Sequence, residues 1–120
     1  MIDRQPFPGP SLGVRCVGEI KREYLRMLRE ADAIFTEELR NSGWYEKTWQ
    51  SFAVFLPVKS VGILNGHRHY GYTIAIRSIN TVDAVTAQVV HLPWELVERV
   101  ATRNPSEVEG VSRVVYDCTP

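Results

Sequence analysis

Apolar residues recur every three or four positions between Glu19 and Asn41, which is the spacing of an amphipathic helix. Charged side chains fill most of the positions between them. Gly43, just beyond, is the residue type that commonly ends a helix. The sequence predicts one long helix over residues 19–41. Its buried face is expected to consist of Ile20, Tyr24, Leu28, Ala31, Phe35 and Leu39.

The middle of the chain changes to short apolar runs rich in β-forming residues. Residues 52–58 form the first run, and Pro57 within it predicts a bend or a sheet edge because proline cannot donate to a ladder. Residues 60–64 form the second run. Asn65-Gly66 follows and favours the type I′ turn of a hairpin.

The return strand of this hairpin is predicted over residues 69–79, where apolar and smaller or polar residues alternate. The smaller and polar set comprises Gly71, Thr73, Ala75 and Arg77. The apolar set comprises Tyr70, Tyr72, Ile74 and Ile76. Because only one face is strongly apolar, we expect helices to cover that side of the sheet alone.

The last third of the chain predicts a second helix and a final strand. Thr81 is suited to cap a short turn through Val85, Pro93 suits the first position of the helix, and Pro105 is expected to end it. The apolar positions of this helix are Leu96, Val97 and Val100.

A strand is predicted over residues 111–118. Alternation places Val111, Arg113 and Val115 on one face, and Val114 and Tyr116 on the other. The chain of 120 residues is thus expected to form one α+β domain. Its two layers would be a mainly antiparallel sheet and helices on one face, in the order helix, two or three strands, helix, strand.

Composition narrows the functional classes. Fourteen basic and fourteen acidic residues cancel, which argues against a nucleic-acid partner. No apolar run is long enough to span a bilayer, and no signal sequence opens the chain, so we expect a cytoplasmic protein without a membrane partner. Cys16 and Cys118 are expected to be reduced thiols.

The sequence nominates no catalytic constellation and no metal site. His67 and His69 would share a strand face, but no third ligand is apparent, so solvated turn residues are the favoured interpretation. Glu37-Glu38, among arginines, is explained by charge pairing on a helix surface. Trp44, Tyr45 and Trp49 form an aromatic group that we interpret as core or interface anchors.

Four blocks of the chain resemble the C-terminal region of GMP synthases. The first, Arg-Gln-Pro-Phe-Pro-Gly-Pro-Ser-Leu at residues 4–12, resembles the hinge Arg-His-Pro-Phe-Pro-Gly-Pro-Gly-Leu of that family. The others are Arg-Glu-Ala-Asp-Ala-Ile at residues 29–34, Gln-Ser-Phe-Ala-Val-Phe-Leu-Pro-Val-Lys-Ser-Val-Gly at residues 50–62, and Ser-Arg-Val-Val-Tyr-Asp at residues 112–117. The blocks occur in the family's order across essentially the whole chain.

The resemblance implies a proline-rich interdomain hinge over residues 1–12 and a dimerisation domain over residues 13–120. In this family the complete enzyme converts xanthosine monophosphate (XMP) to GMP with ATP and glutamine. The pyrophosphatase and amidotransferase motifs are absent here, so this chain is not expected to be catalytic alone and should carry no cofactor. ATP and magnesium would belong to the missing pyrophosphatase domain.

The resemblance also implies site residues. Arg4 matches a hinge arginine suited to contact a nucleotide phosphate, and Gln50 matches a glutamine near the purine, although a solvated arginine and a strand-entry glutamine are equally compatible with the sequence. Arg77, Trp44 and Trp49 are assigned to an interface or to packing. The implied partners are a second copy of the chain, XMP, and pyrophosphatase and amidotransferase subunits.

Several departures from the family pattern bear on these expectations. Gln5 and Ser11 replace a histidine and a glycine of the hinge, and the Tyr-Asp segment at residues 116–117 is not followed by the family's Ser-Lys-Pro-Pro stretch and acidic terminus. A free-standing accessory module that binds a pyrophosphatase subunit or a purine nucleotide is therefore the alternative. A KH-like RNA-binding domain ranks last, because no Gly-x-x-Gly loop is present and the net charge is zero.

Overall fold

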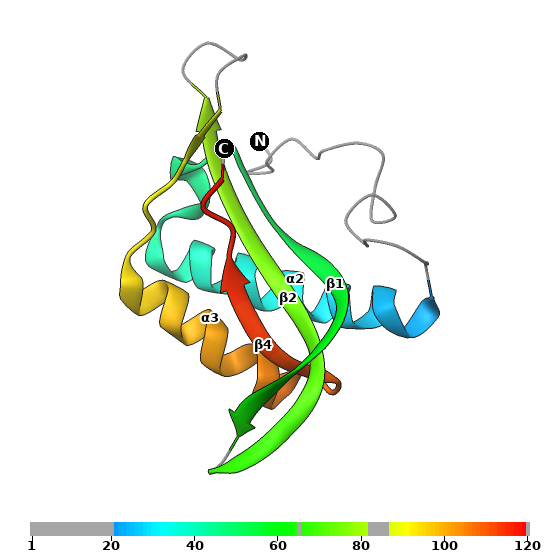
Figure 1. Cartoon of the computed structure of the whole chain (residues 1–120). Helices are drawn as coiled ribbons and strands as arrows, with labels where there is room; N and C mark the ends of the chain where they lie inside the picture. Colours follow the sequence, from blue (N-terminus) through cyan, green and yellow to red (C-terminus); the bar gives the residue numbers. More distant parts are fainter. Residues whose placement is uncertain (1–20, 65, 82–86, 120) are drawn as a thin grey trace.

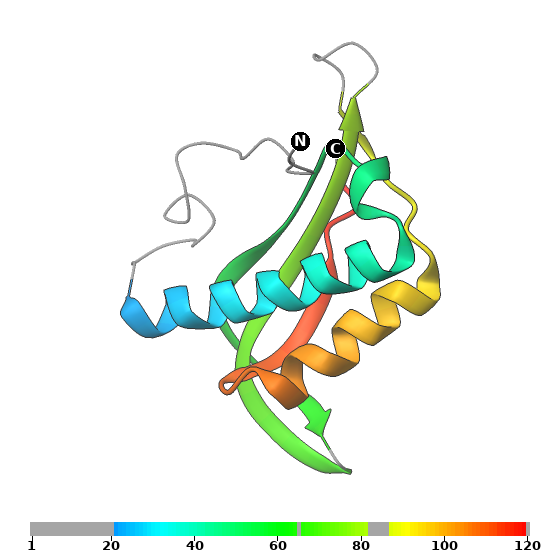
Figure 2. The same cartoon turned by 180° about the vertical axis from the view of Figure 1, so that it is seen from behind.

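The computed structural model describes residues 21–64, 66–81 and 87–119. Two helices, α2 and α3, pack on the same side of a four-stranded sheet (Figures 1 and 2). This arrangement confirms the predicted two-layer α+β fold. The elements in chain order are α2 (Arg22–Ser42), the short 3₁₀ helix η1 (Tyr45–Lys47), β1 (Gln50–Leu64), β2 (His67–Thr81), β3 (Ala87–Val89), α3 (Trp94–Glu107) and β4 (Val111–Tyr116).

Strand β2 is the centre of the sheet. It pairs antiparallel with β1 along most of its length and antiparallel with β3 at its end, from Ile79 to Thr81. β4 pairs with β2 in the parallel sense, since the connection from β2 through α3 crosses over and returns the chain in the same direction. The sheet is therefore mainly antiparallel, as predicted, with one parallel neighbour.

The amphipathic pattern of α2 is confirmed from its first turn to its last. All of the predicted apolar positions from Tyr24 to Leu39 are buried, while the start of the prediction, residues 19 and 20, lies outside the described residues. Gly43 ends the helix in the left-handed conformation with φ of 79°, and its N–H donates to the carbonyl of Arg40.

The core lies between the helices and one face of the sheet. Ile74 and Ile76 are fully buried there, as the alternation of β2 predicts, and Phe55 of β1 is fully buried with them. Tyr24 of α2 stacks on Phe55 with ring centroids 4.5 Å apart, and Tyr72 meets both rings at 5.3 Å. Tyr70, on the same face of β2 but beyond the helices, is 65% exposed.

The two predicted runs of the first hairpin strand form one continuous strand. The register between β1 and β2 shifts between Leu56 and Lys59, so the bend expected at Pro57 is present without ending the strand. Gly66 has φ of 77°, as a type I′ turn requires, whereas Asn65 and the predicted turn through Val85 lie outside the described residues.

The prediction that Pro105 ends the second helix is wrong. α3 continues through Pro105 to Glu107. Pro105 removes one helical bond, the one that its N–H would donate to the carbonyl of Ala101, and only two residues of the helix follow it. Neighbouring side chains also donate to carbonyls of this part of α3: the Asn104 amide donates to Val100 and the Ser106 hydroxyl to Thr102.

The predicted faces of the last strand also need correction. Val111 is fully buried, whereas Arg113 and Val115 are exposed. The register between β4 and β2 shifts at this point, so that Tyr72 pairs with Val111 and the next residue of β2 pairs with Arg113. This irregularity breaks strict alternation and turns Val111 to the core side together with Val114 and Tyr116.

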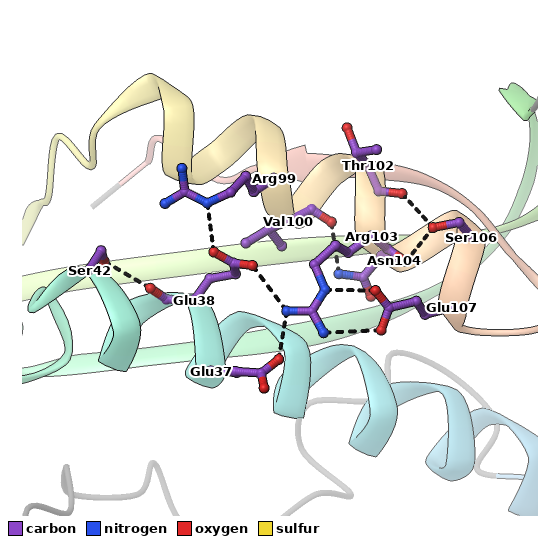
Figure 3. A network of polar contacts seen from close by, with 10 residues as sticks. All are labelled: Glu37, Glu38, Ser42, Arg99, Val100, Thr102, Arg103, Asn104, Ser106 and Glu107. Atoms are coloured by element: carbon purple, nitrogen blue, oxygen red, sulfur yellow. Dashed lines mark hydrogen bonds and ion pairs between the residues drawn. The ribbon is translucent and has the colours of Figure 1, made fainter.

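The acidic pair of α2 does more than pair with charges along one helix surface. Glu38 is buried between the helices, where its carboxylate accepts hydrogen bonds from Arg99 Nε at 2.7 Å and Arg103 Nη1 at 3.0 Å (Figure 3). Arg103 also pairs with Glu37 and Glu107. The cluster therefore fastens α2 to α3, a contact that a local helix pattern could not predict.

Glu38→Gln is expected to lower the free energy of unfolding by about 1 to 2 kcal/mol near neutral pH, because both arginines lose a charged acceptor. Burial alone would raise the pKa of Glu38, but hydrogen bonds and charge from Arg99 and Arg103 outweigh it and lower the pKa below the ordinary 4.5. The stabilisation by the Glu38 carboxylate is therefore fully present above the pKa that this group has in the unfolded chain. It is lost as pH falls through the lower pKa of the group in the folded protein.

Urea unfolding of wild type and Glu38→Gln from pH 7 to pH 3 tests this. The gap in unfolding free energy should close on acidification. A gap that stays constant with pH would contradict the assignment of the stabilisation to the charged carboxylate.

Candidate functional site

The face of the sheet opposite the helices is the candidate functional surface. No described helix covers this face, which is turned toward the viewer in Figure 1. The register pairs Val54 with Ala75 and Leu56 with Thr73 on this face, and Ala75 in turn pairs with Val115 of β4. Val54 and Leu56 are half-buried and Val115 is 39% exposed, so β1 and β4 place apolar side chains on either side of Ala75, which is itself only 8% exposed. We call these four residues the apolar stripe.

Gln50 lies at one end of this face. It begins β1 and pairs with Ile79, while Phe52 pairs with Arg77. Residues paired directly across strands share a face, and diagonal neighbours lie about 7 to 8 Å apart. The structure thus brings Gln50 and Arg77, two of the predicted site residues, to the same end of the same face.

Arg77 is held by the segment that follows β4. Its Nη1 donates to Oδ2 of Asp117 at 2.8 Å and to the carbonyl of Thr119 at 2.6 Å. The other carboxylate oxygen of Asp117 accepts from the N–H of Thr119 at 3.0 Å, and the N–H of Asp117 donates to Ile76. We call the Arg77–Asp117–Thr119 group the clasp.

The remaining predicted site residues are placed differently. Trp44 packs against the core beneath Lys47, whose Nζ lies 4.8 Å from the centre of its ring. Trp49 is 40% exposed, and its backbone N–H donates to Ile79 and to the side chain of Asn80. Arg4 lies outside the described residues. The interface roles of Trp44, Trp49 and Arg77 stay predictions.

No group of three histidine, cysteine, aspartate or glutamate side chains in the described part of the chain is placed to hold a metal ion. His69 instead places its Nε2 2.9 Å from the carbonyl oxygen of Val111. Cys118 is a free, exposed thiol within the clasp segment. Neither described helix is long and apolar enough to cross a membrane.

Tyr116 is a half-buried titratable side chain beside this end of the sheet. Burial raises its pKa to about 12, with opposing charge from Arg77 and smaller contributions from Asp117 and Cys118. Its hydroxyl donates to the carbonyl of Val90. Tyr116 therefore stays neutral near pH 7 and ties β4 to the segment before α3 instead of presenting an acid to the open face.

Sequence reasoning missed Asp117 and Thr119 as partners of Arg77. The only signal was an aspartate just after an apolar strand, at the end of the fourth family-like block. The pairing joins residues 40 positions apart. Such a contact depends on the parallel pairing of β4 with β2, which the sequence pattern did not predict.

Comparisons with known proteins agree with the earlier resemblance. The family model described as the GMP synthase C terminal domain matches residues 37–120. The chain is 60% identical over 117 residues to the glutamine-hydrolysing GMP synthases of Marinomonas sp. and of Haemophilus influenzae strain PittEE, and 59% identical to that of Acinetobacter baylyi.

Each match covers 98% of this chain but only 21% or 22% of the relative. The chain therefore spans about a fifth of the length of these curated relatives. The family match covers well over half of the chain, and the similarity to full-length enzymes extends over nearly all of it. The chain belongs to the GMP synthase C-terminal domain family.

Proposed function

We propose that this domain pairs two subunits of a GMP synthase through the open face of its sheet. The observation that supports this proposal is the apolar stripe formed by Val54, Leu56, Ala75 and Val115, which no described helix covers. Sheet faces of this kind are normally covered by another layer. A second copy meeting the same face would form an isologous, two-fold interface.

Light scattering over a wide range of protein concentration tests this proposal. The wild type is expected at twice the 13.7 kDa mass of the chain. Val115→Asp should raise the dissociation constant of the dimer by about 100-fold, because a carboxylate would be buried without a partner.

Ile63→Asp is the matched control. Ile63 is also an exposed aliphatic residue, at 70%, but it lies on the distal arm of the hairpin and not on the stripe. Its substitution should leave the dimer unchanged. A wild-type monomer at millimolar concentration would refute subunit pairing, and equal weakening by both variants would refute the open face as its site.

We further propose that the Gln50 end of this face contributes to the XMP site. The side-chain amide of Gln50 can both donate and accept hydrogen bonds, which suits the polar edge of a purine. The guanidinium of Arg4 would suit the phosphate of the nucleotide. In this proposal, ATP and magnesium are handled by the other four-fifths of the enzyme, which the relatives possess and this chain does not cover. This domain alone makes no GMP.

The alternative, an accessory module that binds a separate pyrophosphatase subunit or a nucleotide, predicts a different result. Calorimetry with XMP and GMP on the wild-type chain would detect the nucleotide-binding version, and the absence of heat at millimolar ligand would exclude it. A monomer that gains mass only with a pyrophosphatase subunit would favour the accessory role over self-pairing.

A further inference from the structure

The clasp places the segment after β4 on the end of the sheet that carries Gln50. In Figure 1 this segment runs from the tip of β4 toward the end of the sheet where β1 begins. Gln50 and Arg77 lie on the same face as diagonal neighbours of the β1–β2 ladder. The clasp is therefore beside the position to which the proposed function assigns the purine.

Asp117 makes three hydrogen bonds although it lies outside a strand. Its backbone N–H is bonded to Ile76, one carboxylate oxygen to Arg77 and the other to the N–H of Thr119. Arg77 in turn holds the carbonyl of Thr119. Removing the Arg77 guanidinium would break two of these bonds without removing any side chain from the buried core.

Packing alone does not explain why an arginine stands at position 77. Its side chain is 21% exposed, so its guanidinium remains within reach of solvent and of a bound molecule. A charge-assisted pair at such a partly exposed site contributes little to the free energy of unfolding, but it fixes the geometry of the segment that it binds. This separates its role from that of Glu38, whose carboxylate is buried between the helices.

We propose that Arg77 is a positioning residue: through the clasp it holds residues 117–119 across β2 from Gln50, where this segment forms the wall of the purine-nucleotide site that faces Gln50. This inference rests on the proposed nucleotide site. Arg77 acts on the ligand through the segment, and the chemistry it serves is recognition of a purine nucleotide.

The exposed thiol of Cys118 provides a direct probe, because it lies between the two clasped residues. In a Cys16→Ser background, Cys118 is the single thiol of the chain. Its rate of reaction with a thiol reagent, with and without XMP, reports both the order of the segment and the presence of ligand beside it. Calorimetry with XMP on the same proteins measures affinity.

Arg77→Gln removes the charge-assisted hydrogen bonds to residues 117–119, so it is expected to accelerate the reaction of Cys118 about tenfold and to weaken XMP binding about tenfold. The melting temperature should change little. XMP should protect Cys118 in the wild type, and Arg77→Gln and Gln50→Ala should both reduce this protection. Arg77→Lys keeps the charge and should restore part of the affinity.

Arg26→Gln is the matched control. Arg26 also donates to a carboxylate, that of Glu30, and to a backbone carbonyl, that of Glu109, but on the helix layer. Its substitution should leave Cys118 reactivity and XMP affinity at wild-type values, whereas a general loss of order would change both variants alike and would overturn the proposal.

The remaining outcomes separate this inference from the proposed function. If XMP binds but Cys118 is not protected, or if Arg77→Gln binds XMP within twofold of wild type, the positioning role is refuted and the Gln50 site stands. If XMP gives no heat at millimolar concentration, both the nucleotide site and the positioning role are refuted. Subunit pairing, measured by light scattering, is unaffected by either result.

Discussion

Gly62→Ala is expected to lower the free energy of unfolding by about 3 kcal/mol or more, the cost of overpacking against a backbone that has no room to move. A Cβ at this position would lie 2.1 Å from the carbonyl oxygen of Ser112 and 3.2 Å from its carbonyl carbon. Both atoms belong to β4, whose chain is held against β2. The neighbour cannot swing away as a flexible side chain would.

The surrounding contacts explain why the approach is so close. The hydroxyl of Ser112 donates to the carbonyl of Ser60 at 2.7 Å, and Arg113 donates to the carbonyl of Val61. The hairpin arm is thus drawn onto the start of β4 by side chains that reach its backbone. A methyl group on Gly62 would push the two apart and break these bonds.

Gly66→Ala is the matched control for this prediction, since Gly66 lies in the same hairpin with φ of 77° and nothing within 4 Å of the added Cβ. Gly66→Ala should lower the free energy of unfolding by about 1 to 2 kcal/mol, which is the cost of placing an alanine in the left-handed backbone conformation. Urea unfolding of both variants compares them. Equal losses would mean that the close approach to Ser112 does not constrain the arm.

Phe55→Ala should cost about 3 to 5 kcal/mol of unfolding free energy, because it removes a fully buried ring from the centre of the core. The ring stacks on Tyr24 at 4.5 Å and contacts Tyr72 at 5.3 Å, so its loss would leave a cavity between α2 and the sheet. Part of the loss would come from these aromatic pairs.

Thermal and urea unfolding would measure this effect against Tyr70→Ala. Tyr70 lies on the same hairpin but is 65% exposed, so its truncation should change the unfolding free energy by less than about 1 kcal/mol. Phe55→Leu should recover much of the loss by refilling the site. A Phe55→Ala protein as stable as Tyr70→Ala would show that the contacts of Phe55 with Tyr24 and Tyr72 do not anchor α2 on the sheet.

Much of the fold could be predicted from the residues because it rests on local periodicity. The spacing from Tyr24 to Leu39 predicted the buried face of α2, the alternation of Ile74 and Ile76 predicted the covered face of β2, and Gly43 predicted the helix end. Four family-like blocks predicted the family, which the comparisons confirm.

The predictions that were wrong fell where local rules meet tertiary contacts. Pro105 is tolerated because only two residues of the helix follow it, and Val111 turns inward because the β2–β4 register shifts between it and Arg113. Neither event has a signature in the spacing of apolar residues.

The sequence by itself determined the types of the main elements, the apolar faces of α2, α3 and β2, the covering of one side of the sheet by helices, and the family. Only the tertiary structure decided that β4 returns parallel to β2, that Glu38 is buried between two arginines, and that Arg77 bonds to Asp117 at the end of the sheet where Gln50 lies. The physical reason is range: periodicity reports which side of an element is apolar, whereas charge pairs between residues 40 or 61 positions apart exist only once the strands and helices have been brought together.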